Sequence, residues 1–192
     1  MNELLQKLTG GDLRSDGRAD EVAEEVIKNP RLLNKLVEGL RESDNLVRAR
    51  TTHALEKISR TNPEMLQGLT LQLIETALKD KVPMVKWHLA VIFGNIPFSE
   101  KEIDAVILTL FHLRNDENAF VKSWAIASLA IIGRKNKSKR KEIIGRIKAL
   151  QNDESIAVRG RANKALNILE NEDEKIPISW LKARDLRILE DR

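Results

Sequence analysis

Apolar residues recur along the chain with two periods. One is the 36 to 38 residues between successive repeats, and the other is the turn of an α-helix within each repeat. Nine-residue segments that begin at Val47, Val85, Val121 and Val158 align without gaps, and these valines stand 38, 36 and 37 residues apart. Eight positions later come Leu55, Phe93, Leu129 and Leu166, and eleven positions later come Ile58, Ile96, Ile132 and Leu169. Apolar residues at this spacing lie on one face of a 3.6-residue helix. The pattern predicts four amphipathic helices, one in each repeat.

A second amphipathic helix precedes each of these four. Apolar residues stand eleven positions before each valine at Leu36, Ile74, Leu110 and Ile147, and fourteen before at Leu33, Leu71, Ile107 and Ile144. Short polar turns such as residues 41–45 and 115–118 separate the two helices. One hairpin cannot bury both faces, whereas stacked hairpins share a continuous core. The sequence therefore predicts an all-α solenoid of antiparallel hairpins, with repeats at 30–60, 61–97, 98–134 and 135–171.

The two ends of the chain depart from the repeat. Residues 1–29 predict two helices separated by Gly10 and Gly11, which we interpret as N-terminal capping helices. After the polar residues 171–175, the spacing of Ile178, Leu181, Leu186 and Leu189 predicts a C-terminal capping helix within 172–192. Residues 1–192 are therefore predicted to form a single repeat domain.

A polar signature accompanies the turns. An Asp is followed six residues later by a basic residue that itself follows a valine, as in Asp80 with Lys86, Asp116 with Lys122 and Asp153 with Arg159. This pattern resembles the HEAT repeat over about residues 30 to 170, although Glu42 takes the place of the Asp in the first unit. The resemblance implies a right-handed superhelix with the second helix of each hairpin on the concave side. It also implies that the basic residues fix turns and link neighbouring repeats rather than bind phosphates.

Composition agrees with a folded helical protein. The chain has 192 residues, of which 42% are apolar and 32% charged, with nine glycines, five prolines and no tyrosine. No apolar run approaches the length that spans a bilayer, and the first residues lack the layout of a signal peptide, so we expect a cytoplasmic protein without membrane contact. The absence of cysteine excludes disulfides, thiolate metal sites and a cysteine nucleophile.

The side of the second helices that faces away from the predicted core contains the candidate binding surface. The residues on this outward side are small or polar in the first and last repeats and mostly apolar in the middle two. Either tight curvature buries these residues, or they form the exposed floor of a groove; in the second case Trp87 is the best anchor. The candidate protein-binding residues are Trp87, Val91 and Ile126, with Arg50, His88 and Arg161 as the rim.

A basic cluster supports an alternative function. Residues 134–141 contain six cations, Arg134, Lys135, Lys137, Lys139, Arg140 and Lys141. They could bind nucleic acid or an acidic protein, but no aromatic residues are interleaved for base stacking, so a solvated turn is the favoured interpretation. HEAT-like DNA glycosylases hold DNA in a basic groove with tryptophans and an Asp, and the centre of the predicted groove offers no such Asp.

Candidates for catalysis are few. His53, His88 and His112 fall in three different repeats, and the sequence has no HExxH motif and no glycine-rich phosphate loop. We therefore predict no enzyme activity, no metal and no cofactor. The leading hypothesis is a scaffold that binds a protein or peptide on its concave face. The flanking cations favour an acidic partner, and nucleic-acid binding is the alternative.

Overall fold

The computed structural model describes residues 1–184 and 186, and these residues form helices and turns without any strand. In chain order the α-helices are α1 (Glu3–Gln6), α2 (Ala19–Lys28), α3 (Leu33–Val37), α4 (Asn45–Thr61), α5 (Thr70–Lys79), α6 (Pro83–Asn95), α7 (Glu100–Leu113), α8 (Ala119–Lys135), α9 (Lys137–Lys148) and α10 (Ile156–Glu170). Short 3-10 turns flank several of them at Pro30–Leu32, Glu38–Arg41, Pro63–Leu69 and Ala149–Asn152.

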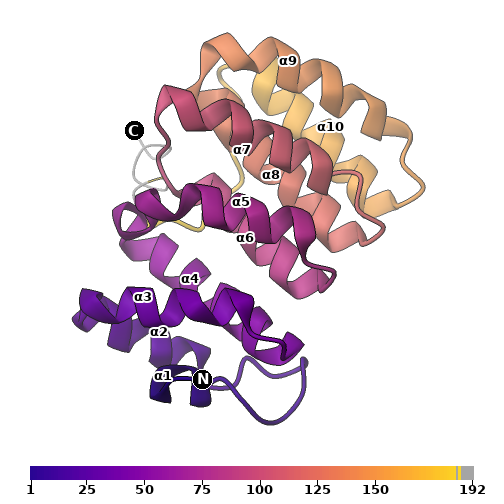
Figure 1. Ribbon diagram of the computed structural model, residues 1–192. Helices are drawn as coiled ribbons and strands as arrows, with labels where there is room; N and C mark the ends of the chain where they lie inside the picture. The colour runs from indigo at the N-terminus through magenta and orange to yellow at the C-terminus, as the bar shows by residue number, and fades with distance from the viewer. Residues whose placement is uncertain (185, 187–192) are drawn as a thin grey trace.

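The helices stack as hairpins in two layers. Helices α3, α5, α7 and α9, here called the A helices, form one layer, and α4, α6, α8 and α10, the B helices, form the other (Figure 1). Each B helix packs against the B helix of the next hairpin, and α5 packs against α7. At the N-terminus α1 contacts α3 and α2 packs against α4, so these two short helices extend both layers. The predicted all-α solenoid of stacked hairpins is confirmed.

Polar residues in the turns start the B helices. The side chain of Asp44 accepts a hydrogen bond from the backbone N–H of Leu46 at the start of α4, and Asn118 accepts from Phe120 and Val121 at the start of α8. Pro83 occupies the first turn of α6, where its missing N–H leaves no bond unmade. The polar turns of the sequence are therefore the N-terminal caps of the helices that follow them.

The middle B helices are buried on nearly all sides. Helix α6 packs between α4 and α8, and α8 packs between α6 and α10. Small residues allow α6 and α8 to approach each other closely. Ser128 of α8 donates a 2.6 Å hydrogen bond to the carbonyl of Ala90 in α6, and a Cβ on Gly94 of α6 would lie 2.7 Å from Ser128 Oγ. Apolar positions all round α6 and α8 are thus explained by neighbours on both sides.

In the C-terminal segment, residues 171–184 and 186, the capping helix predicted within 172–192 begins later than the spacing suggested, because the helical residues are Arg184 and Leu186. Residues 172–183 form turns and bends without helix. Pro177 lacks a backbone N–H and disfavours helical geometry at the residue before it, which explains the irregular path. Ile178 is 66% exposed, whereas Leu181 and Leu186 are buried. Leu189, the last residue of the predicted stripe, lies outside the described residues.

None of the helices in residues 1–184 and 186 combines the length and the apolar character that a membrane span requires.

Candidate functional site

A ladder of ion pairs runs along the turns between A and B helices. In the first three repeats the basic residue of the signature pairs with the Asp of the following repeat, and these Asp side chains are largely buried. The pairs are Arg48 with Asp80 at 2.7 Å, Lys86 with Asp116 at 2.6 Å, and Lys122 with Asp153 at 2.8 Å. The predicted role of these cations in linking neighbouring repeats is confirmed.

The same carboxylates also shape their own turns. Asp153 Oδ1 accepts a 2.9 Å hydrogen bond from the Ser155 N–H, while the hydrogen bond from Lys122 holds the pKa of Asp153 below its usual value. In the last repeat Arg159 donates to the carbonyls of Asp153 and Glu154. Arg48 makes the same bonds to the carbonyls of Glu42 and Ser43. The contacts of the cation with its own turn are therefore the same with a Glu at position 42, because the cation uses the backbone oxygens.

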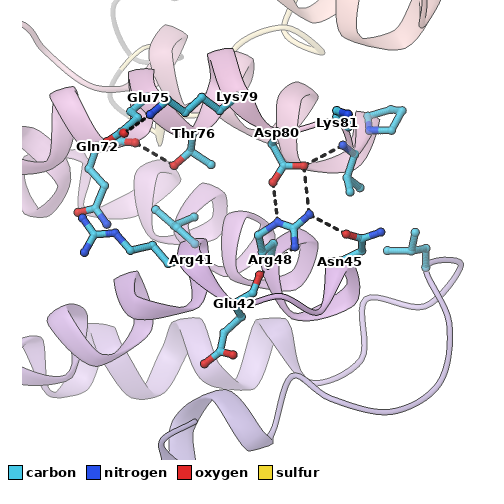
Figure 2. Close-up of a pocket in the computed structure, with 14 residues that line it drawn as sticks. Arg41, Glu42, Asn45, Arg48, Gln72, Glu75, Thr76, Lys79, Asp80 and Lys81 are labelled. Carbon is cyan, nitrogen blue, oxygen red and sulfur yellow. Dashed lines mark hydrogen bonds and ion pairs between the residues drawn. The ribbon is translucent and has the colours of Figure 1, made fainter.

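A pocket of about 770 Å³ lies beside the first rung of this ladder (Figure 2). Arg41 and Glu42 line one wall, and α5 supplies the other. Glu75 and Lys79 pair with each other at 2.6 Å across one turn of α5, and Arg48 pairs with Asp80. Four of the charges that line this pocket are therefore already paired with one another.

The predicted groove floor is mostly buried. Val91 is 3% exposed and Ile126 is 0% exposed, because each lies where α6 and α8 pack against their neighbours. Of the two explanations left open by the sequence, burial by the fold holds for these two residues, and neither can contact a partner. Trp87 is partly exposed and packs against the edge of the core.

Arg50 is not a rim residue, which corrects the sequence-based hypothesis. It is 2% exposed, and its guanidinium donates to backbone carbonyls of the N-terminal loop. The acceptors are Leu8, Thr9, Gly10, Asp12 and Ser15, at 2.6 to 3.2 Å. The loop can wrap this closely because Gly10, Gly11 and Gly17 adopt positive φ, and a Cβ on Gly17 would lie 2.6 Å from Arg50 Cζ. Arg50 therefore ties the N-terminal unit to the first repeat.

His88 is also buried rather than at the rim. Stacking of the repeats brings it next to His53, with ring centroids 4.7 Å apart, and Asp16 Oδ1 lies 3.1 Å from His53 Nδ1. Burial lowers the pKa of His88 to about 2, and the neighbouring His53 adds to this effect. Within residues 1–184 and 186, no three His, Asp or Glu side chains are arranged to hold a metal ion. The two histidines are packing residues.

An aromatic pair remains accessible on the B-helix face. Phe120 is 54% exposed, and its ring meets that of Trp87 edge-on, with centroids 5.2 Å apart and planes at 83°. Phe120 also contacts Trp124 one turn along α8, at 6.4 Å. The sequence-based hypothesis missed Phe120, although it stands three positions before Ser123 and therefore lies on the same helix face as that outward position. This aromatic pair, the partly exposed Trp87 and the exposed Phe120, is an accessible apolar feature of the face.

Arg161, the remaining predicted rim residue, lies between two indole rings. Its guanidinium carbon is 5.6 Å from the centroid of the Trp124 ring and 4.7 Å from that of Trp180 in the C-terminal segment. A cation over an indole face is attracted by the ring quadrupole. Burial in this setting lowers the pKa of Arg161. The C-terminal segment thus covers the part of the B-helix face where Arg161 lies.

The sequence suggested that the basic cluster, residues 134–141, forms a solvated turn, but the structure places it at the adjoining ends of two helices. Lys135 ends α8 and Lys137 begins α9, so Asn136 alone separates the two helices. Arg134 donates to the carbonyls of Ile168, Asn171 and Glu172, and Arg140 pairs with the Glu172 carboxylate at 2.8 Å. Further pairs join Lys137 to Glu172 at 3.3 Å and Lys139 to Asp104 at 2.5 Å, while Lys135 and Lys141 are exposed. Four of the six cations are therefore engaged within the molecule.

The fold and its inter-repeat ladder define a helical-repeat solenoid of the HEAT and armadillo type. No family model matches the sequence, and no curated protein does either. Among solved structures, the chain is similar to an engineered protein, with 25% identity, a TM-score of 0.64, and 87% and 79% of the two chains covered. It is also similar to the complex of CpcE and CpcF of phycocyanin lyase from Nostoc sp. PCC7120, with 19% identity, a TM-score of 0.66, and 84% and 95% covered.

A designed armadillo repeat protein in complex with the peptide (KR)4 is a further structural neighbour. It shares 19% identity and a TM-score of 0.64, with 88% of this chain and 80% of the other covered. At such low identities these likenesses establish the fold, and the function has to be argued from the surface.

Proposed function

We propose that this protein is a non-enzymatic scaffold that binds a protein or an extended peptide on its B-helix face. The observation that carries the proposal is the aromatic pair, in which Trp87 and Phe120 come from two neighbouring helices and Phe120 is 54% exposed. Exposed aromatic side chains on a rigid support lose little conformational entropy on binding, and aromatic residues, Phe included, are enriched in protein interfaces.

The nature of the structural neighbours supports a binding role. One designed armadillo neighbour is described in complex with a peptide, and two further neighbours are engineered proteins. The phycocyanin lyase subunits share only the fold at 19% identity, so no reaction is carried over from them. We propose no chemistry for this chain, because His53 and His88 are buried in the packing between α4 and α6.

A protein partner is favoured over nucleic acid by the state of the basic cluster. Arg134 and Arg140 are used by the molecule itself, through the carbonyl groups and the carboxylate of the C-terminal segment. A protein that binds nucleic acid through phosphate contacts needs cations that are free to replace counterions. The aromatic pair needs no such charge, since its contribution comes from apolar area.

The proposal can be tested with peptides selected from a random display library on the immobilised full-length protein. We expect the selected peptides to bind Phe120→Ala at least tenfold more weakly, because truncation of an interface anchor commonly costs about 2 kcal/mol. Thermal stability should change little, since the ring is more than half exposed. The control is Leu71→Ala, an exposed apolar residue of α5 in the opposite layer. Peptides that bind both variants equally well would place the binding site elsewhere.

A further inference from the structure

A row of aromatic rings crosses the B-helix face from α4 to α8. The ring centroid of His53 in α4 lies 4.7 Å from that of His88 in α6, and the His88 centroid lies 3.6 Å from that of Trp87. The next ring is Phe120 at the start of α8, 5.2 Å from Trp87. Because α4, α6 and α8 are successive neighbours in the B layer (Figure 1), the row runs across the helices from one repeat to the next.

Two exposed carboxylates lie at the α4 end of this row. Asp16 of the N-terminal loop places its Oδ1 3.1 Å from Nδ1 of His53, and Asp20 of α2 places its Oδ1 3.7 Å from Nε2 of the same ring. Their side chains are 65% and 63% exposed. Lys57 of α4 pairs with Asp20 at 3.0 Å, and its side chain is only 29% exposed. A molecule that approaches this end of the row therefore meets two carboxylates and one cation.

None of the three rim residues expected from the sequence lies exposed at the α4 end of the row. Arg50 is buried under the N-terminal loop, and His88 is buried within the row itself. Arg161 belongs to α10 at the opposite end of the face, where its guanidinium lies against the rings of Trp124 and Trp180. The charge beside the aromatic pair on the α4 side is therefore negative rather than positive.

The two ends of the stack differ in charge in the same sense. Residues 1–29 contain seven acidic and four basic side chains, whereas residues 135–171 contain four acidic and ten basic ones. The small net charge of the whole chain conceals this difference. A charge difference along a binding surface orients a bound chain, because one direction of binding brings unlike charges together and the other brings like charges together.

These features fit an extended peptide that has a Lys or Arg a few residues from an apolar side chain. The apolar side chain packs on the rings of Trp87 and Phe120, and the cation reaches Asp16 and Asp20. Packed helices lie about 10 Å apart, and an extended chain covers roughly 3.3 Å per residue, so about three to five residues separate the two contacts.

We propose that the B-helix face from α2 to α8 binds a basic segment of a partner protein, with its Lys or Arg at Asp16 and Asp20 and its apolar side chain on the aromatic pair. This inference rests on the proposed binding function and adds the charge and the orientation of the partner. The apolar contact supplies most of the affinity, and the carboxylates steer association and select the direction of the bound chain.

The experiment applies a double-mutant cycle to the display-selected peptides that depend on Phe120. Their binding to the full-length protein is measured by fluorescence anisotropy, for wild type and for a variant with Asp16→Asn and Asp20→Asn. We expect these peptides to contain Lys or Arg, and to bind the variant about three- to tenfold more weakly, since each exposed ion pair contributes little. Replacing that Lys or Arg by Gln should weaken binding to wild type by the same factor and leave binding to the variant almost unchanged.

The matched control is a variant with Glu64→Gln and Glu75→Gln, which removes the same amount of charge from exposed residues in and before α5 of the other layer. It should bind the peptides as wild type does. Phe120-dependent peptides without a basic residue would overturn the inference, as would equal losses in the control or equal losses from the Gln peptide in both proteins. Each of these results leaves the proposed function intact, whereas selected peptides that ignore Phe120→Ala contradict that function itself.

Discussion

His88 shows at the scale of one residue how a polar side chain comes to be buried between repeats. Its Nδ1 lies 3.5 Å from Thr52 Oγ1, and its Nε2 has no hydrogen-bond partner among the described residues. The ring lies 4.7 Å from that of His53. Because burial lowers the pKa of His88 to about 2, the ring is neutral in the folded protein at neutral and mildly acidic pH.

This burial predicts a pH dependence of stability. Between pH 6.5, the ordinary pKa of histidine, and pH 2, the unfolded chain binds a proton at His88 that the folded chain does not bind. The free energy of unfolding therefore falls as the pH falls, by up to about 1.4 kcal/mol per pH unit from this group. We expect His88→Phe to remove this slope, so that the stability difference between variant and wild type shifts by up to about 2 kcal/mol in favour of the variant between pH 7 and pH 5.

The measurement is urea unfolding at several pH values, followed by circular dichroism. The same substitution at His112, which is exposed on α7, removes a histidine without touching the buried site and serves as the control. A His88→Phe protein with the pH slope of wild type would show that the ring accepts a proton in the folded state.

At the scale of the elements, glycine positions decide how closely two B helices can approach. A Cβ on Gly94 of α6 would lie 2.7 Å from Ser128 Oγ and 3.2 Å from Ser128 Cβ in α8, whereas a Cβ on Gly160 of α10 would meet nothing within 4 Å. Both glycines lie within helices. Packing of α6 against α8 requires Gly94, whereas Gly160 only adds backbone entropy to the unfolded chain.

The two sites predict opposite effects of the same substitution. Gly94→Ala should destabilise the protein by about 1 to 3 kcal/mol, because α6 and α8 must move apart to accept the methyl group. Gly160→Ala should stabilise it by about 0.5 to 1 kcal/mol, the usual gain for a helical glycine without a steric conflict. Chemical denaturation of both variants checks the pair. Equal effects at the two sites would contradict the close approach of α6 and α8.

Periodicity in the sequence predicts helices well and their surroundings poorly. The repeated valine segments predict the B helices because burial of one face determines where apolar residues stand. The same helical positions place Arg50 and Val91 on the outward side, but they cannot reveal that the N-terminal loop wraps Arg50 or that α4 and α8 cover α6. The glycines at 10, 11 and 17 were the available signal for that loop.

Segments without regular structure are the second feature that the periodicity of the sequence predicts poorly. The spacing of Ile178, Leu181 and Leu186 imitates a helix, yet Pro177 and contacts with α8 and α10 determine the path of residues 172–183. The cluster at 134–141 looked like a loop because of its charge. Its cations instead lie at the adjoining ends of two helices, where Arg134 and Arg140 satisfy carbonyl groups.

At the scale of the whole molecule, the ion-pair ladder joins hairpins that otherwise touch mainly their neighbours. In such an array, stability is a sum of repeat and interface contributions, so weakening the last interface should affect the single repeat beyond it more than the longer stack before it. The last rung joins the third repeat to the fourth through Lys122 of α8 and Asp153, which is largely buried.

Removal of this rung should therefore loosen one end of the solenoid. We expect Lys122→Met to cost about 1 to 2 kcal/mol, because the Asp153 carboxylate keeps only its turn hydrogen bond from Ser155. Hydrogen exchange should speed up in α9 and α10 while α4 and α6 keep their protection. Lys79→Met is the control, since its pair with Glu75 is exposed and lies within a single helix, where we expect no measurable change. A uniform loss of protection along the chain would mean that the solenoid unfolds as one cooperative unit, in which the ladder adds stability without setting the order of opening.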